Sequence, residues 1–294
     1  MKRAQNHNVG WLLTGLLLAA AAGGCMGPES RILPVCPGKA NVRESLSALA
    51  TQAEKAVSFR VSSGRCLLTY HNPDNGKQER HNLWLKLWFN PPQEMYIQGS
   101  IAADPKAVVI GSNDERFWLS LRPKEISGYY EGRWSEVRDF GGLIMSPKVL
   151  LEAFGIIACT QEELRARAWS LKNKGAFDIL TRHDESGRPT QRVYVFACDY
   201  RVLKIEYINP DGDVVAVTQM GAYKPVTDGF SIPTEIKAII VGPDNTRDSM
   251  EIELNSIKAM EFTQQQRDFM FVPRGRERAE HVYEYQDGRW VPQQ

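Results

Sequence analysis

Short runs in which apolar and polar side chains alternate fill the chain from residue 57 to residue 262, and this alternation restricts the possible folds more than any other feature. Successive side chains of a strand point to opposite sides, so the segment HNLWLKLWF (81–89) has two distinct faces. On one face lie Leu83, Leu85, Leu87 and Phe89, and on the other lie Trp84 and Trp88. Strong turn signals at 72–76 (NPDNG) and 209–212 (NPDG) separate neighbouring runs. Connections this short leave no room for crossover helices and predict an antiparallel sheet.

The same pattern recurs along most of the chain. Further strands are predicted at 57–71, 95–101, 107–111, 115–121, 125–131, 175–182, 191–200, 201–208, 213–223, 230–241 and 247–262, with an edge strand at 281–285.

Two longer segments have helical periodicity instead. Apolar residues at helical spacing predict a helix over 42–56, with Asn41 as its N-cap and Glu44 completing a capping box. Ser146 and Pro147 begin a second helix that ends at Gly155, and a short helical turn is predicted over 161–169. These helices and about ten strands predict a mainly β (α+β) fold, in which a curved antiparallel sheet, or incomplete β-barrel, has helices plugging its concave side.

The N-terminus has the layout of a secretory signal. Lys2 and Arg3 precede an apolar run that is too short to span a bilayer as a helix of about 20 residues. Small residues lead to Cys25, and the pattern resembles the lipobox of bacterial lipoproteins, with Ala22 where leucine is usual. The resemblance implies that Cys25 is acylated and anchors the chain in a membrane, while the alternative is an ordinary secretory signal. In the lipoprotein sorting rule of enteric bacteria, an Asp after the lipidated cysteine retains the protein in the inner membrane. By resemblance to that rule, Met26 implies the outer membrane, with the protein facing the periplasm.

Four further cysteines would then lie in an oxidising compartment, where disulfides persist. They are Cys36, Cys66, Cys159 and Cys198. We prefer a pairing of Cys36 with Cys66 and of Cys159 with Cys198, although four cysteines allow three pairings. The alternative is that some are buried free thiols. No CxxC spacing occurs, so a zinc site is not predicted.

The composition excludes several classes of function. The net charge is +1 and no basic block occurs, so a nucleic-acid partner is not predicted. No sequence motif of a hydrolase, zinc protease, phosphate-binding loop or dinucleotide site is present. The histidines after residue 24 are far apart and lie near turns or strand ends. The sequence therefore predicts neither an enzyme nor a cofactor.

Several strands carry large apolar groups on both faces, more than a sheet wetted on one side needs. One explanation is burial beneath helices or a partner, and the other is a cavity for a lipid-like ligand. The candidate cavity-lining residues are Leu83, Leu85, Leu87, Phe89, Ile97, Phe117, Leu119, Leu151 and Phe154. Trp84 and Trp88 are candidates for binding a partner protein.

Three segments resemble the LolA/LolB-like group of bacterial envelope proteins, which includes an RseB-like branch. They are the opening helix NVRESLSALATQAEKAVSFR, the segment GAYKPVTDGFSIPTEIKAII (221–240) and the closing segment 250–275 with Phe269, Phe271, Pro273 and Gly275. The resemblance implies an incomplete barrel with helices over an apolar cavity. The protruding leucine of the receptor branch has no counterpart in the loop 102–105. The predicted division is a signal peptide (1–24), a lipidated tether (25–40), a LolA/LolB-like domain (41–275) and a polar tail (276–294).

These features predict an outer-membrane-anchored lipoprotein that binds a lipid acyl chain or a lipoprotein in an apolar cavity, in trafficking or sensing. The alternative is a non-catalytic envelope scaffold or sensing module with a filled core, which binds another envelope protein.

Overall fold

The computed structural model describes residues 34–72, 75–102, 104–122, 127–136, 152–157, 168–242, 246–287 and 289–293. Val35–Gln294 form one compact unit, and the following description concerns this unit. Cys25, Leu151 and Cys159 lie outside the described residues, as does most of the predicted second helix. Among the described residues, no helix is long and apolar enough to cross a membrane.

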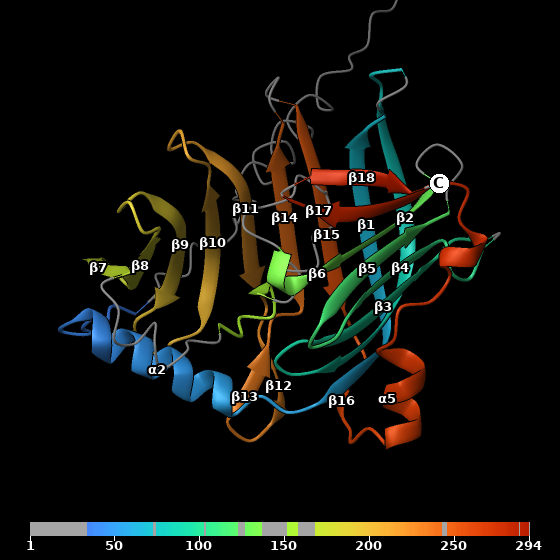
Figure 1. Cartoon of the computed structure of the whole chain (residues 1–294). Helices are drawn as coiled ribbons and strands as arrows, with labels where there is room; N and C mark the ends of the chain where they lie inside the picture. The colour runs from blue at the N-terminus through green and yellow to red at the C-terminus, as the bar shows by residue number, and fades with distance from the viewer. Residues whose placement is uncertain are drawn as a thin grey trace, which may run out of the picture. The chain divides into compact units, whose positions relative to one another are not determined.

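One large curved sheet dominates the unit, and its two edges do not meet (Figure 1). Along the sheet the strand order is β18-β17-β6-β5-β4-β3-β2-β1-β15-β14-β11-β10-β9-β8-β7, and β16 also pairs with β1. The strands of its first half are β1 (Phe59–His71), β2 (Gln78–Asn90), β3 (Glu94–Ser100), β4 (Val108–Ser112), β5 (Arg116–Leu121) and β6 (Gly128–Arg133). Then follow β7 (Trp169–Lys174), β8 (Phe177–His183), β9 (Pro189–Phe196), β10 (Val202–Ile208), β11 (Val214–Gly221), β14 (Glu235–Val241), β15 (Arg247–Leu254), β16 (Ile257–Ala259), β17 (Val282–Gln286) and β18 (Arg289–Gln293).

The predicted mainly β fold with a curved, unclosed sheet is confirmed, but the predicted number of strands is too low. The described part of the chain contains a 16-stranded sheet and a two-stranded ribbon of β12 (Lys224–Thr227) and β13 (Phe230–Ile232). The run 230–241 divides at Pro233, which has no N–H to donate to a ladder, and the run 247–262 divides after Leu254. The strand predicted at 281–285 is confirmed as β17, but it is not at the edge of the sheet, because the unpredicted β18 lies outside it.

The prediction of a purely antiparallel sheet is wrong at one pair. Strand β17 runs parallel to β6, with Val282 opposite Tyr129 and Glu284 opposite Glu131. A parallel pair needs a long connection, and here the chain travels from β6 through more than half of its length before β17 returns to the same edge.

Two α-helices are described, α2 (Val42–Glu54) and α5 (Gln264–Met270). The predicted N-cap of α2 is confirmed, because the Asn41 Oδ1 accepts from the Glu44 N–H at 3.0 Å. Helix α5 was not predicted, although Thr263 and Gln266 form a capping box at its start. The predicted helical turn over 161–169 is wrong at its end, because Trp169 is the first residue of β7.

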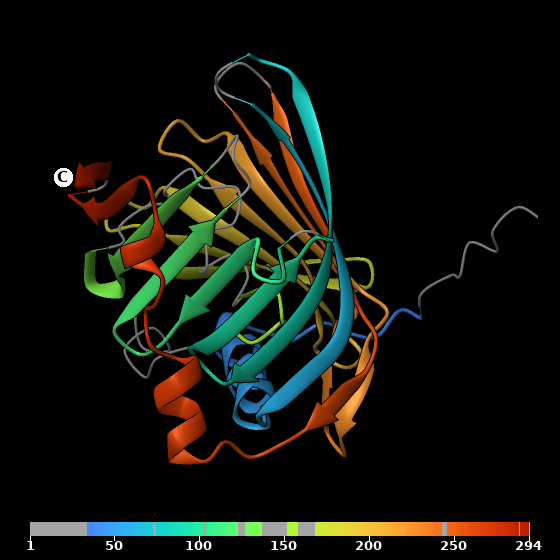
Figure 2. The same cartoon turned by 90° about the vertical axis from the view of Figure 1, so that its right-hand side faces the viewer.

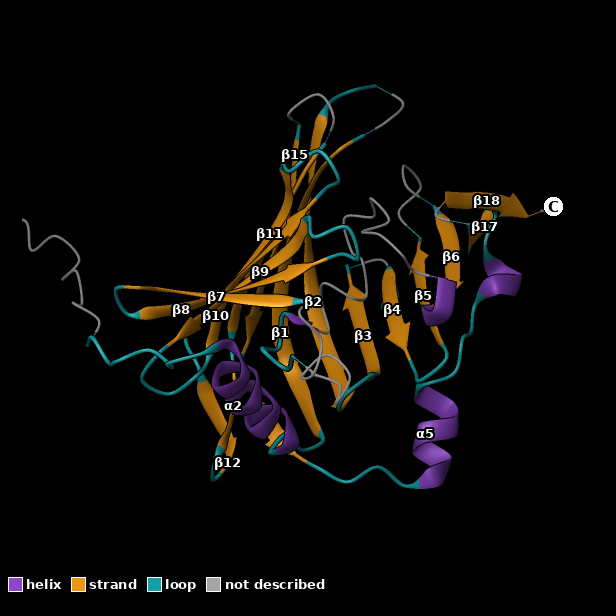
Figure 3. Cartoon of the chain, turned by 60° about the vertical axis from the view of Figure 1, so that its left-hand side comes forward, coloured by secondary structure: helices purple, strands orange, loops and turns teal. Residues whose placement is uncertain are grey.

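One face of the sheet, called here the inner face, carries the main hydrophobic core. It includes Phe59 and Val61 of β1 and alternate residues of the strands on both sides, and α2 contributes Leu46 and Leu49. Figures 2 and 3 show α2 inside the curve of the sheet, where it contacts β7 and β8. Helix α5 lies elsewhere and buries none of its residues. It contacts the start of β3 through an ion pair between Arg267 and Glu94, whose Nη2 and Oε1 atoms are 2.8 Å apart.

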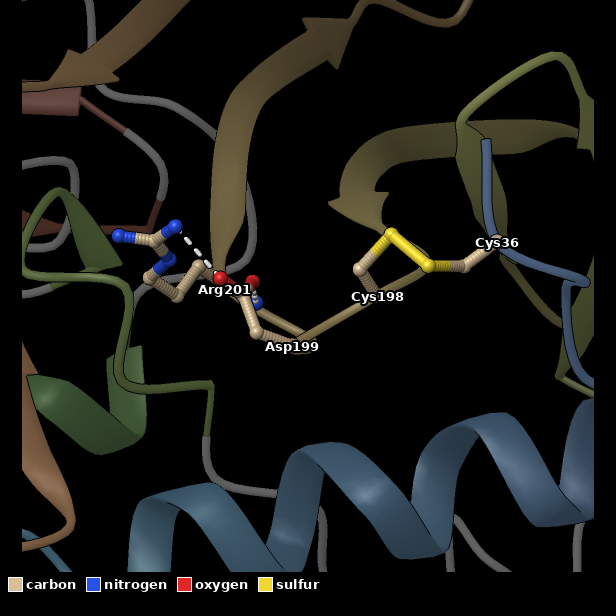
Figure 4. The surroundings of a disulfide bond; sticks show 4 residues. All are labelled: Cys36, Cys198, Asp199 and Arg201. Carbon is tan, nitrogen blue, oxygen red and sulfur yellow. Dashed lines mark hydrogen bonds and ion pairs between the residues drawn. A yellow bond between two sulfur atoms is a disulfide. The ribbon is translucent and has the colours of Figure 1, made fainter. Parts of the chain in front are cut away.

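A disulfide fixes the N-terminal arm to the turn between β9 and β10 (Figure 4). It joins Cys36 to Cys198, with the two Cα atoms 5.1 Å apart. Both preferred pairings, Cys36 with Cys66 and Cys159 with Cys198, are therefore wrong, because Cys36 and Cys198 are bonded to each other. Cys66 lies on the inner face of β1 as a buried free thiol, and this burial raises its pKa to about 12. Strand alternation places Cys66 within the core, where the arm does not reach it.

Candidate functional site

A pocket of about 380 Å³ opens where the C-terminal end of α2 meets the turn between β9 and β10. Residues from five separate parts of the chain line it, which explains why no local sequence pattern announced it. The lining consists of Gln52, Lys55, Phe154, Gly155, Ile156, Asp199, Tyr200, Arg201, Val202, Tyr223, Gly229, Phe230 and Ser231. A volume near 400 Å³ lies within the range of about 300–1,000 Å³ that small-molecule sites occupy.

The floor of this pocket is continuous with the main core. Phe154 packs against Phe89 and Phe59, with ring centroids 4.9 Å and 5.9 Å apart. Phe230 also contacts Phe59, at 6.4 Å between centroids. Both Phe154 and Phe230 line the pocket and are at least 95% buried. A displacement of Phe154 would therefore extend the pocket directly into the aromatic cluster of the inner face.

The rim of the pocket is polar and carries two cations. The exposed Lys55 is the C-cap residue of α2, where a positive charge is favoured by the helix dipole. Arg201 pairs with Asp199, with its Nη2 2.5 Å from the carboxylate Oδ2, and its guanidinium lies 5.0 Å above the Tyr223 ring. The Tyr223 hydroxyl donates to the Val202 carbonyl. Burial raises the pKa of Tyr223, so this hydroxyl remains a donor at neutral pH.

Two glycines allow the backbone to line the pocket closely. Gly155 has a φ of +74°, and a Cβ at this position would lie 2.9 Å from the Tyr223 hydroxyl. Gly229 has a φ of +86°. Glu152 is helical and is followed by a turn over 153–155, which agrees with the predicted helix end at Gly155; residues 146–151 of this helix lie outside the described residues.

A buried polar cluster fixes one wall of the pocket. Tyr200 has a φ of 63° and donates its hydroxyl to Asp178 Oδ2 at 2.7 Å. The same hydroxyl lies 2.6 Å from the Ser45 Oγ of α2. Asp178 is completely buried and also accepts from the Lys39 N–H at 2.9 Å and from Asn173 Nδ2 at 3.1 Å. A buried carboxylate is tolerated when several donors surround it. The cluster connects the N-terminal arm, α2 and β8.

The structure brings the predicted cavity residues together. Leu83, Leu85, Leu87, Phe89, Ile97, Leu119 and Phe154 belong to one buried cluster on the inner face, each at most 4% exposed. Phe117 is also buried, but its ring contacts Trp134 and Trp290 near the edge of the sheet. Of these residues only Phe154 lines the pocket. Sequence reasoning missed the rim residues Lys55, Arg201 and Tyr223, which lie in a helix end and in turns.

The two predicted partner-binding tryptophans lie on the opposite, outer face. Trp84 is 62% exposed and Trp88 is half-buried. A third tryptophan, Trp118, is buried on the outer face of β5 and covers Gly111, where a Cβ would lie 2.0 Å from the indole ring.

The sequence matches no protein-family model and none of the curated proteins. Solved structures with a similar fold include a LolA superfamily protein from Nitrosomonas europaea, which is 12% identical, with 78% of this chain and 97% of that chain covered and a TM-score of 0.46. A DUF1329 family protein from Desulfovibrio piger is 14% identical, with 77% and 96% covered and a TM-score of 0.48. The MucA/MucB complex of Pseudomonas aeruginosa is similar over 75% of this chain and 99% of that chain, at 9% identity and a TM-score of 0.25.

Proposed function

We propose that this chain is a non-enzymatic, membrane-anchored envelope lipoprotein that binds the acyl chain of a lipid or of another lipoprotein. The pocket at the end of α2 is the entrance, and the inner face of the sheet accommodates the hydrocarbon. The observation that carries the proposal is the pocket floor. Its Phe154 and Phe230 side chains line the pocket on one side and pack against the aromatic cluster of the core on the other. Each methylene that leaves water on binding would contribute about 0.8 kcal/mol.

The polar rim suits the other end of such a ligand. Lys55 and the Arg201–Asp199 ion pair lie beside the apolar floor, so an acyl chain could be inserted while its polar or anionic head stays in water near the charge of Lys55. Acylation of Cys25 would hold the protein on the outer membrane and facing the periplasm, since one chain gives marginal binding and further chains make it stable.

The test is to purify the protein from its own membrane and to measure bound lipid by native mass spectrometry. Ser231 is half-buried on the pocket lining, and Ser231→Trp should fill the pocket and reduce the bound lipid at least tenfold. Ser186→Trp, in the exposed turn after β8, is the matched control and should retain the lipid. Intact mass of the wild type and of Cys25→Ala reports acylation separately. Absence of bound lipid from correctly acylated wild-type protein would refute acyl-chain binding.

A second candidate function rests on the burial of the inner face. The described cavity candidates are at most 5% exposed, which is also what a filled core would show. In that case the chain would be a scaffold or sensing module that recognises another envelope protein through a sheet edge such as β7. Cross-linking in cells separates the two candidate functions. If the core is filled and the partner protein binds at a sheet edge, its capture should survive Ser231→Trp, which alters only the pocket.

A further inference from the structure

The outer face of β1, β2 and β3 presents aromatic and basic side chains side by side. We call this surface the outer patch, and it consists of Arg60, Arg65, Trp84, Lys86, Trp88 and Tyr96. The register places Arg60 opposite Trp88 and Arg65 opposite Trp84. On the other side of β2, Trp88 lies opposite Tyr96. Directly opposed residues of an antiparallel pair point to the same side, and Lys86 alternates with Trp84 and Trp88 along β2, so all six belong to one face.

The aromatic groups of the outer patch remain accessible to solvent. Trp84 is 62% exposed, with the Arg65 guanidinium 5.4 Å from its ring. Trp88 and Tyr96 pack against each other, with ring centroids 5.7 Å apart. An exposed tryptophan flanked by arginine has an apolar body and a cationic edge, a combination typical of the interface between a bilayer and water.

The cations of the patch are not neutralised by the described carboxylates. Arg60, Arg65 and Lys86 are all exposed, and none takes part in an ion pair with a described residue. Two carboxylates lie next to the patch on this face, because Glu253 of β15 is directly opposite Arg65 and Glu235 of β14 is opposite Glu253. Lys258 of β16 lies opposite Arg60, so the four cations Arg60, Arg65, Lys86 and Lys258 outnumber these two acids. The face therefore keeps an excess of positive charge, which attracts an anionic surface.

A second group of exposed apolar residues extends this surface beyond β3. Phe269 is 61% exposed and Val272 is 42% exposed, and the Arg274 guanidinium lies 4.5 Å above the Phe269 ring. Helix α5, which carries Phe269, is joined to this face by the Arg267–Glu94 ion pair, since strand alternation places Glu94 on the same side of β3 as Tyr96. The combination of an exposed aromatic ring and an arginine is thus repeated at the C-terminal end of α5.

We propose that the outer patch seats on the surface of an anionic phospholipid bilayer, with Trp84 in the headgroup region and Arg60, Arg65 and Lys86 against the lipid phosphates. Basic residues near an anionic membrane and interfacial tryptophans both favour this contact. The link from Cys25 to Val35 reaches at most about 36 Å when extended. If Cys25 is acylated as proposed above, that link makes the contact intramolecular, so that a weak patch is sufficient.

The test measures the accessibility of Trp84 on the anchored full chain. Protein purified from membranes is reconstituted into vesicles of phosphatidylethanolamine with phosphatidylglycerol, or of phosphatidylcholine alone, and hydroxyl-radical modification is measured residue by residue. Because the readout is local, it does not depend on whether an acyl group or an uncleaved apolar segment provides the anchor. We expect the modification rate of Trp84 to fall about threefold or more in the anionic vesicles only, since the attraction follows the lipid charge. Phe177 of β8 should not change.

Charge reversal provides the matched comparison. The patch variant combines Arg65→Glu with Lys86→Glu and should abolish the protection of Trp84. The control combines Lys172→Glu with Lys174→Glu on the exposed part of β7. It makes the same change in net charge and should preserve the protection. Salt at about 1 M, where the Debye length is about 3 Å, should remove the protection in the wild type. All variants alter exposed residues, and unchanged thermal unfolding would verify their fold.

Three outcomes would overturn the proposal. The first is equal accessibility of Trp84 in neutral and anionic vesicles. The second is equal loss of protection in the β7 control, which would mean that only net charge matters. The third is protection in native membranes but not in protein-free vesicles, which would identify the patch as a site for a protein partner. Bound lipid in the pocket should be unaffected by the patch variants, so this test and that of the acyl-binding site can fail separately.

Discussion

Removal of the Cys36–Cys198 disulfide should lower the free energy of unfolding substantially. The bond joins residues separated by 162 positions, and in the chain-entropy view a closed loop of this length corresponds to about 5 kcal/mol. The arm that carries Cys36 is also held by hydrogen bonds, among them the Lys39 N–H on Asp178 and the Asn173 Nδ2 on the Lys39 carbonyl at 3.1 Å. Because measured values usually fall below the entropic limit, we expect a loss of about 3–5 kcal/mol for Cys36→Ser with Cys198→Ser.

Urea unfolding followed by tryptophan fluorescence measures this change, with linear extrapolation to water. The two single variants serve as controls, because each alone breaks the same bond. If the covalent link is the cause, Cys36→Ser, Cys198→Ser and the double variant should lose nearly the same free energy, far from additivity. A loss below about 1 kcal/mol, or single effects that add up to the double effect, would contradict the loop-closure argument.

Three further predictions concern single positions. Asn41→Ala removes the acceptor for the first turn of α2 and should cost about 1 kcal/mol in the same urea assay, whereas Asn41→Asp should cost little. Gly155→Ala places a methyl group at a φ of +74° and 2.9 Å from the Tyr223 hydroxyl. It should therefore lower the free energy of unfolding by more than about 1 kcal/mol and alter the pocket. An unchanged free energy of unfolding would contradict the backbone geometry. The pKa of Asp184 is lowered from 3.8 to about 2 by hydrogen bonds from its own turn, foremost from the Ser186 hydroxyl and then from the Arg188 N–H. A carboxylate whose pKa is lowered in the folded state stabilises the fold at pH values above its pKa in the unfolded state. This stabilisation is lost as the pH falls through the folded-state pKa, so the stability difference between wild type and Asp184→Asn should shrink between about pH 4 and pH 2.

The strands were the most predictable part of the structure. In β2 the alternation of Leu83, Leu85 and Leu87 with exposed neighbours is a local signal, and burial follows it residue by residue. The N-cap of α2 was predictable for the same reason, because Asn41 and Glu44 are three residues apart. The positions where strands end were harder to predict from the sequence. The break between β13 and β14, for example, falls at Pro233 within the run 230–241.

Features that depend on long-range placement could not be predicted. The partner of Cys36 is decided by the position of the β9–β10 turn next to the arm, while Cys66 is turned into the core by its place in β1. The pocket rim at Lys55 and Arg201 arises because a helix end and a distant turn meet. The return of β17 to β6 likewise has no local signature.

The pairing of β1 with β15 has a consequence for how the chain acquires its structure. Strands β2 to β6 and β7 to β14 can each form by pairing close neighbours in sequence, but the two halves are joined only when β15 lies against β1, with Leu68 opposite Met250. A join between segments so far apart is slow to form, because most of the chain must be present before it can close. A polypeptide exported in an extended state would thus have little tendency to complete its sheet before translocation ends.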